Sequence, residues 1–370
     1  MKQILLGVAI IIGLTTKAQD TLIISEKNPQ DTIVKLPNPL TVSGYIESYY
    51  AYDFNRPADN NRPGFIYSHS RHNEFNLNLG FVKVGYNAEK VRANLAFAAG
   101  TYINANYAAE PGVLKNIFEA NAGFKIGQKN LWLDAGIFTS HIGFEGAIGK
   151  DNWTLTRSIV ADNSPYYEAG AKLTFTTSNN KWLFTGLALN GWQRIKRVDG
   201  NSLMNFGTQI TYKPTDKVTL NYSTFIGTDK ADSMRQMRYY HNIYGIIQLS
   251  KVFGIIAGFD IGTEEKSNIN SKMNTWYTPV LIAKLNVSPK VSLTARGEYY
   301  NDEKGILILT GTVNGFKTTG ISLNVDYTPT PNVLFRVEGR SLNSKDNIFA
   351  KGSVMGNTNS FITTAFALSF

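Results

Sequence analysis

Hydrophobic and polar residues alternate along most of the chain from Leu40 to the C-terminus. In residues 91–97 the odd positions are apolar and the even positions are mostly polar or small, and residues 169–175, 218–222 and 321–327 repeat the pattern. A period of two residues predicts β-strands with one apolar and one polar face. A soluble β-sandwich would give the same period, so alternation alone leaves two architectures open.

Short polar segments interrupt the alternation at regular intervals. They are centred near residues 88, 129, 179, 215, 251, 289 and 330, and their spacings run from 36 to 50 residues. Each interval is long enough for two strands of about ten residues and one longer loop. Counted from Leu40 to Phe370, the rhythm predicts eight hairpins. We therefore expect an all-β fold, a transmembrane antiparallel up-and-down β-barrel of about sixteen strands with short periplasmic turns and long extracellular loops.

The absence of long apolar runs supports this interpretation. After the first twenty residues the longest candidate is residues 306–309, which is far too short for a transmembrane helix. A closed barrel is the other structure that satisfies every backbone polar group in lipid. Aromatic residues also cluster at predicted strand ends, as in the adjacent pairs Tyr49 and Tyr50, Tyr166 and Tyr167, Tyr239 and Tyr240, Trp276 and Tyr277, and Tyr299 and Tyr300. Such placement is typical of the aromatic belts at membrane interfaces.

The N-terminus has the composition of an export signal. Lys2 precedes an apolar stretch over residues 4–14, and Thr16, Lys17 and Ala18 form a small-x-small cleavage site. A membrane anchor is the alternative, but the stretch is only about half a bilayer span. We expect a signal peptide at residues 1–18, a periplasmic lead at 19–39 and the barrel at 40–370, in the outer membrane of a Gram-negative cell.

Two irregularities stand out against the rhythm. Within residues 75–86 the apolar side chains change from odd-numbered to even-numbered positions near Gly80. This change predicts a β-bulge there. The widest interval between turns indicates an enlarged third loop at about residues 141–163. Residues 306–310 either lengthen the thirteenth strand or belong to the seventh loop.

The C-terminus alternates Phe366, Leu368 and Phe370 and ends on the aromatic residue. It resembles the terminal-strand signal that barrel-assembly machinery recognises in outer-membrane proteins. Together with residues 138–145 and 163–168, the chain over about 40–370 resembles the OmpL-like family of Bacteroidota-type outer-membrane β-barrel porins. The resemblance implies passive diffusion of small hydrophilic solutes or ions, with outer-membrane lipid, lipopolysaccharide and the assembly machinery as partners. It implies no catalytic residues and no cofactor, and it leaves association as a homotrimer open.

A barrel of sixteen strands is too wide for its own side chains to fill, so it encloses an aqueous channel unless something plugs it. In porins of this topology the third loop folds inward and narrows the pore. By that analogy the charged residues of the third loop are constriction candidates: Glu145, Lys150, Asp151, Arg157 and Asp162. The alternative is that this loop covers the barrel from outside.

Charged residues at the strand positions that alternate with the apolar ones should point inward, so they are expected to line the lumen. The main candidates are Arg92, Lys125, Asp134, Lys172, Arg296, Glu298, Arg336, Glu338 and Arg340. In all, such positions hold seven cations and eight acids, although the chain has a net charge of +9. Much of the basic excess lies in the short periplasmic turns and in residues 194–197, where it influences selectivity less. The basic segment 194–197 favours contact with lipopolysaccharide phosphates. We therefore expect weak ion selectivity.

Enzymatic and metal-binding readings have little support. His69 and His72 have a metal-like spacing, but only Glu74 lies near enough in sequence to be a third ligand, so an exposed loop is expected. A barrel hydrolase would need His241 to meet Ser223 or Ser250, and no spacing singles them out. No glycine-rich phosphate loop and no independent nucleic-acid signature is present. A substrate-specific channel and a non-conducting structural or adhesive barrel remain as alternatives to a general porin.

Overall fold

The computed structural model describes residues 39–267 and 269–370. The expected signal peptide (1–18) and all but the last residue of the expected lead (19–39) lie outside the described residues. Within the described part, no helix is long and apolar enough to cross a membrane.

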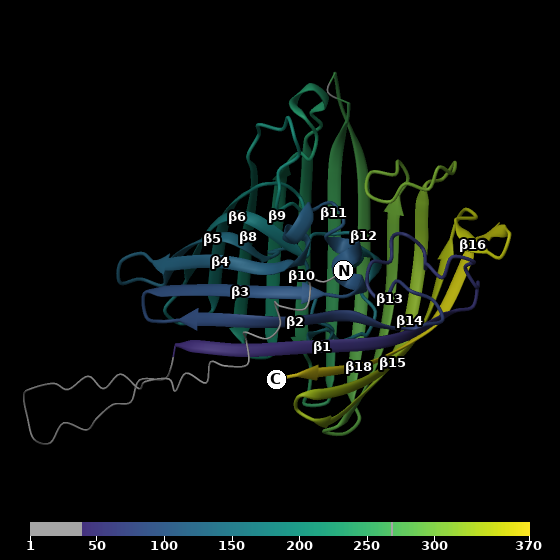
Figure 1. Cartoon of the computed structure of the whole chain (residues 1–370), viewed down its shortest axis with the longest axis horizontal. Coiled ribbons are helices and arrows are strands. Elements are labelled where there is room, and N and C mark those ends of the chain that lie inside the picture. The colour runs from purple at the N-terminus through teal and green to yellow at the C-terminus, as the bar shows by residue number, and fades with distance from the viewer. Residues whose placement is uncertain (1–38, 268) are drawn as a thin grey trace, which may run out of the picture.

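The described chain forms one closed antiparallel barrel of sixteen strands, which confirms the expected fold class. Figure 1 shows the strands following one another around the ring. In chain order they are β1 (Leu40–Asp53), β2 (Phe75–Asn87), β3 (Val91–Ala99), β4 (Ile117–Lys125), β5 (Leu131–Thr139), β6 (Tyr167–Thr176), β7 (Trp182–Leu189), β8 (Asn205–Thr215), β9 (Val218–Gly227), β10 (Arg238–Gln248), β11 (Phe253–Ser267), β12 (Asn270–Asn286), β13 (Val291–Asp302), β14 (Phe316–Thr330), β15 (Val333–Ser344) and β18 (Thr358–Ser369). A separate hairpin of β16 (Phe349–Lys351) and β17 (Val354–Gly356), which the sequence did not predict, lies between β15 and β18.

Each predicted short turn joins two strands, and most other connections are long loops. Loop 1 (54–74), loop 2 (100–116), loop 3 (140–166), loop 4 (190–204), loop 5 (228–237), loop 7 (303–315) and loop 8 (345–357) lie at the other end of the barrel. Loop 2 contains α1 (Thr101–Asn106) and η2 (Gly112–Asn116), loop 3 contains η3 (Gly149–Asp151) and α2 (Ile159–Asp162), and loop 5 contains η4 (Asp232–Met234). Loop 3 is the longest of these connections, as expected, and residues 306–310 belong to loop 7.

The expected long sixth loop is wrong. β11 and β12 continue to pair as far as Ser267 and Asn270, so the residues that were expected to form a loop extend the hairpin instead. Backbone hydrogen bonding along both strands satisfies polar groups that a loop would leave to water. The hairpin is visible as the long green strands in Figure 1.

Exposure alternates along the strands and identifies the inner face. On β13 the side chains of Thr294, Arg296 and Glu298 are buried, whereas Leu293, next to Thr294, is 43% exposed on the outer face. The predicted bulge is present on β2, two residues from Gly80: Leu79 pairs with Glu47 and Leu77 with Ser48, so Asn78 is left over. The bulge turns the Asn78 amide inward, where its Oδ1 accepts a hydrogen bond from the His69 backbone N–H at 2.9 Å.

The aromatic pairs are divided between the two faces of the wall. Tyr239 is 38% exposed on the outer face, and its neighbour Tyr240 is 1% exposed inside. Trp276 and Tyr300 are buried in the same way, and both Tyr166 and Tyr167 are buried. The belt interpretation is therefore wrong for the inner member of each pair, because successive strand residues point to opposite faces.

The last strand closes the barrel against the first. β18 pairs with β15 on one side and with β1 on the other. Phe370 and Gly44 exchange two backbone hydrogen bonds, of 2.8 and 3.0 Å. Phe366 and Phe370 are 39% and 66% exposed on the outside, and Leu368 shares their parity.

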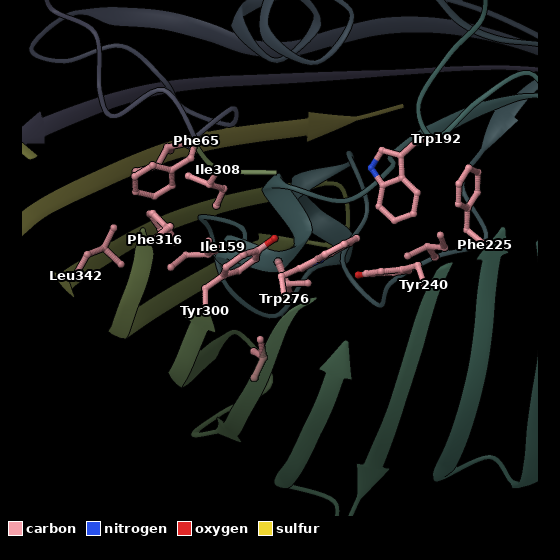
Figure 2. Packing of buried hydrophobic residues seen from close by; sticks show 14 of the residues in the cluster. Phe65, Ile159, Trp192, Phe225, Tyr240, Trp276, Tyr300, Ile308, Phe316 and Leu342 are labelled. Atoms are coloured by element: carbon pink, nitrogen blue, oxygen red, sulfur yellow. The ribbon is translucent and has the colours of Figure 1, made fainter. Parts of the chain in front are cut away.

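Inside the loop end of the barrel lies an extensive apolar cluster. Phe65 of loop 1 is 4.7 Å from Phe316, and Trp192 of loop 4 is 4.9 Å from Phe225, measured between ring centroids. Figure 2 shows Ile159 of loop 3 between these groups, close to Tyr300. The extracellular half of the lumen is thus packed with side chains from several loops, which the strand pattern did not predict.

Candidate functional site

Loop 3 contacts inner-face residues on well-separated strands. The Gly143 N–H donates to Asn242 on β10 at 3.2 Å, and the Lys150 N–H donates to the Tyr45 hydroxyl on β1 at 3.2 Å. The Ile159 N–H donates to Glu298 on β13 at 2.7 Å. Loop 3 therefore lies inside the ring of strands and crosses it.

A network of buried charges joins loop 3 to β13 and β15. The Arg296 guanidinium donates to the Thr156 carbonyl at 2.6 Å and to Glu338 at 2.8 Å. Glu338 in turn accepts the Thr156 N–H at 2.6 Å. Arg340 donates to Glu298 at 2.5 Å and to the Arg157 carbonyl at 2.8 Å. The buried charges of the wall are thus paired with one another, and they also bond the backbone of loop 3.

The tip of loop 3 is held by the neighbouring part of the same wall. Arg336 donates to the Gly149 carbonyl at 2.7 Å and to the Asn152 carbonyl at 3.0 Å. Its Nε also donates to Asp326 at 2.7 Å. Gly149 lies so close to the Glu47 carboxylate on β1 that a Cβ at this position would collide with it. A side chain at this position would have to displace the Glu47 carboxylate, which bonds to His69 and Tyr45.

The five constriction candidates separate into two groups. Glu145 accepts hydrogen bonds from the backbone and hydroxyl of Ser158, and Arg157 donates to three carbonyls of its own loop. Asp162 accepts from Ser68 of loop 1 at 3.1 Å. These three side chains are buried and shape the loop itself. Lys150 and Asp151 pair with each other at 2.9 Å, and their side chains are 36% and 56% exposed.

Asp162 sits in an environment that disfavours its charge. Burial raises the pKa of its carboxyl to about 7, although Arg340 and Arg157 nearby act in the opposite direction. The side chain is therefore partly protonated at neutral pH. Ser68 and Tyr166 both reach its Oδ1, the latter at 3.4 Å.

The opposite wall carries the other lumen candidates. Arg92 binds Asp134 through two hydrogen bonds, of 2.6 and 2.5 Å, and stacks over Trp132 at 4.3 Å. Lys172 lies 4.5 Å from the Phe138 ring. Lys125 is on the inner face of β4, between the more exposed Phe124 and Ile126. Arg92 is 31% exposed, so this wall is open to the lumen, unlike the wall of β13 to β15.

Loop 1 also folds into the barrel, and this corrects the expectation of exposed histidines. His69 is fully buried and its Nε2 lies 2.7 Å from Glu47 on β1, while His72 accepts the Asp53 N–H at 2.9 Å. Burial lowers the pKa of both imidazoles. In the sequence, the one indication of such a contact is that Glu47 is among the eight acids at strand positions expected to face the lumen.

His141, at the start of loop 3, was also missed. Its Nδ1 lies 2.9 Å from Glu168 and its Nε2 lies 2.9 Å from the Thr224 carbonyl. Burial lowers the pKa of His141, but the Glu168 carboxylate outweighs burial and the net shift is upward. A protonated His141 can donate to both acceptors and anchor the loop to β6 and β9.

The hydrolase arrangement with Ser223 is contradicted. His241 is on the outer face of β10, with its Nδ1 2.7 Å from the Tyr222 hydroxyl, whereas Ser223 is buried inside and donates to the His141 carbonyl at 2.8 Å. Ser250 lies in the short turn after β10, at the far end of the strand from His241. Over residues 39–267 and 269–370, no group of three or more potential metal ligands gathers.

A family model described as "Putative beta-barrel porin-2, OmpL-like" matches residues 39–370, which is the whole barrel. The chain belongs to this family. For this OmpL-like porin, no curated protein gives a sequence match.

Solved porins share the barrel of this OmpL-like porin at low sequence identity. The anion-selective porin from Comamonas acidovorans aligns with a TM-score of 0.59 and 11% identity over 90% of this chain and 99% of its own. Salmonella typhi OmpF, in complex with daunomycin, gives a TM-score of 0.59 and 10% identity over 90% and 97%. The trimer form of Vibrio cholerae OmpT gives 0.57 and 6% over 90% and 99%. These similarities show the fold.

Proposed function

We propose that this OmpL-like porin allows passive diffusion of small hydrophilic solutes or ions across the outer membrane, through a water-filled pore narrowed by loop 3. The observation that carries the proposal is the path of loop 3, which contacts β1, β10 and β13 from inside the barrel. A sixteen-strand barrel encloses a channel unless it is filled. A loop that crosses this channel reduces its cross-section.

The residues receive different roles within this proposal. Lys150 and Asp151 face the remaining space, whereas Glu145, Arg157 and Asp162 hold the loop in shape. Arg296, Glu298, Arg336, Glu338 and Arg340 anchor the loop, and Arg92, Lys125, Asp134 and Lys172 line the open wall.

Phe366, Leu368 and Phe370 serve as the assembly signal, after export by residues 1–18. Lipid surrounds the apolar outer face, lipopolysaccharide meets the loops, and one similar porin is described in a trimer form, which supports a homotrimer.

A closed barrel is the second candidate, and the apolar cluster favours it. Phe65, Ile159 and Trp192 from three different loops pack inside the extracellular half of the lumen with wall residues such as Phe316 and Trp276. Apolar surface packed in this way excludes water. If these loops stay in place, the barrel conducts poorly and has a structural or adhesive role, or it opens only for a particular solute.

Planar-bilayer recording of the purified full-length barrel separates these functions. A diffusion porin gives stable ohmic conductance steps. A substrate-specific channel shows a conductance that one solute blocks in a saturable way. A barrel that inserts, shows heat-dependent mobility on a denaturing gel, and yet remains insulating would contradict the proposed pore.

A further inference from the structure

The charges of the inner wall near the short turns are unequally paired. Three acids lie in this half of the lumen, and each is bound to a base: Glu119 to Lys83 at 2.9 Å, Asp134 to Arg92 at 2.5 Å, and Asp326 to Arg336 at 2.7 Å. All three acidic residues are less than 10% exposed. The negative charge of this region is therefore both neutralised and covered.

Three lysines in the same half have no carboxylate partner within 4 Å among the described residues: Lys125, Lys172 and Lys284. Lys172 contacts the Phe138 ring at 4.5 Å, and Lys284 lies 5.9 Å from the Trp153 ring at the tip of loop 3. Lys172 is in register with Asp134 across β5 and β6, but both oxygens of that carboxylate are occupied by Arg92. After pairing, this half of the lumen keeps an excess of three positive charges.

The positions of these lysines place them around the lumen rather than on one side. Lys125 is the last residue of β4, Lys172 lies in the lower half of β6, and Lys284 is two residues before the end of β12. Lys125 and Lys172 come from the same side of the ring, with only β5 between their strands, and Lys284 comes from the other side. Their charges therefore act on ions that cross this half of the lumen, and salt screens this effect.

The acids that made the charge count of the sequence balanced lie elsewhere or are covered. Glu47, Glu168, Asp260, Glu298 and Glu338 are at most 8% exposed, and they bond to loop residues or to neighbouring side chains. Because loop residues or neighbouring side chains cover these acids, a permeating ion meets mainly the uncovered lysines. Over all inward-facing positions the numbers of basic and acidic residues nearly balance. Over the uncovered positions, basic residues are in excess.

We propose that the pore prefers small anions, and that Lys125, Lys172 and Lys284 create this preference. The inference rests on the proposed function, since it requires a conducting lumen, and it replaces the weak selectivity that the sequence suggested. Uncompensated positive charge on the lumen wall lowers the energy of anions in the lumen and raises that of cations.

The test is the reversal potential of the full-length protein in a planar bilayer under a KCl gradient. We expect a potential of the sign that chloride permeation produces, and a smaller preference when both solutions are raised to about 1 M, where the Debye length falls to about 3 Å. The triple variant Lys125→Gln, Lys172→Gln, Lys284→Gln should lose most of the anion preference and keep its conductance steps.

A matched triple variant, Lys129→Gln, Lys251→Gln, Lys290→Gln, removes the same charge from three periplasmic turns. It should retain the preference. Equal loss in both variants would overturn the assignment to the three lumen lysines. A wild-type barrel with ohmic steps but no anion preference would overturn this inference and leave the proposed porin function intact. An insulating wild-type barrel would overturn both the anion preference and the porin function. Heat-dependent gel mobility checks that each variant is folded.

Discussion

At the scale of single residues, Arg296 carries the largest share of the contact between loop 3 and the wall. It is buried and bonds Thr154, Thr156 and Glu338. Removing one partner of a buried ion pair typically costs about 3–5 kcal/mol, because the other charge is left unpaired. We expect Arg296→Ala to destabilise the docked loop by about this amount and to expose residues 140–166 to protease, measured by limited proteolysis of the intact barrel.

The double variant Arg296→Met, Glu338→Leu is the control for this prediction. Replacing both members of a buried pair by apolar residues of similar volume is often close to neutral. The double variant should therefore resist protease better than Arg296→Ala. If the single variant leaves loop 3 as resistant as the wild type, the network does not hold the loop.

Asp162 gives the attachment of loop 3 a pH dependence. Burial raises its pKa to about 7 in the folded state, so the folded protein binds more protons than the unfolded chain between about pH 4 and pH 7. Stability of the docked loop therefore falls as pH rises through this window. Hydrogen exchange of the amides of residues 159–163 should be faster at pH 8 than at pH 5, beyond the intrinsic pH effect.

His141 shifts in the same direction at the other end of the loop. Its raised pKa stabilises the folded form below the unfolded value of about 6.5, and this contribution is lost as pH rises through the folded value. Asp162→Asn removes the pH-dependent contribution of Asp162 to the stability of the docked loop and leaves that of His141. The variant should show a smaller pH effect at residues 159–163 than the wild type; an unchanged effect would show that Asp162 does not titrate in this range.

At the scale of elements, β18 depends on its last residue to close the barrel. Phe370 exchanges two backbone hydrogen bonds with Gly44, and its ring covers the position where Gly44 has no side chain. We expect Phe370→Ala to reduce the amount of folded barrel in the outer membrane several-fold, measured as the heat-modifiable band. Phe335→Ala removes another outward-facing ring, 45% exposed, from β15, so it should have a much smaller effect if the terminal position is what matters.

The strands were predictable because alternation and turn chemistry are local properties of the sequence. The seven short turns, the enlarged loop 3 and the bulge beside Gly80 were all located from the pattern, and the structure confirms them. The pattern did not locate the β16–β17 hairpin or the long β11–β12 hairpin. Both depend on strand pairing beyond the membrane, where no apolar face is required. The prediction that both members of each aromatic pair lie in an interface belt was wrong for a simpler reason, because neighbouring strand residues face opposite sides of the barrel wall.

The candidate site was only partly predictable. Parity placed Arg296, Glu338 and Arg340 on the inner wall correctly, because the alternation decides which face a residue occupies. Parity cannot say what covers that wall. The role of Arg157 as a brace for its own loop, and the contact between His69 and Glu47, arise from loops that fold back into the barrel. Such contacts join residues far apart in sequence and leave no local signal.

At the scale of the whole molecule, the barrel combines two different interiors. Its extracellular half is packed with apolar side chains from loops 1, 3, 4, 7 and 8, and the half near the short turns is charged and more open. The chain has no cysteine, so no disulfide holds this arrangement. The closed hydrogen-bonded ring and the loop contacts provide the stability instead. In the function that we propose, permeation is limited where the two halves meet, because loop 3 crosses there.

Shortening loop 3 tests this limit directly. Replacing residues 146–156 by a short glycine-serine linker removes Gly149, the exposed Lys150 and Asp151, and Trp153 from the lumen, while Arg296 and Arg340 can still pair with Glu338 and Glu298 on the wall. Because the wall stays paired, the barrel should still fold. We expect a larger single-channel conductance than that of the wild type, since conductance increases with the open cross-section.

The control is a deletion of residues 351–354, which are exposed at the tip of the β16–β17 hairpin and lie outside the lumen network. Its conductance should match that of the wild type. If the loop 3 variant folds, as judged by heat-dependent mobility, and conducts no better than this control, loop 3 does not set the width of the pore. The limit would then lie in the apolar cluster, and the same recording on a Trp192→Ala variant would locate it.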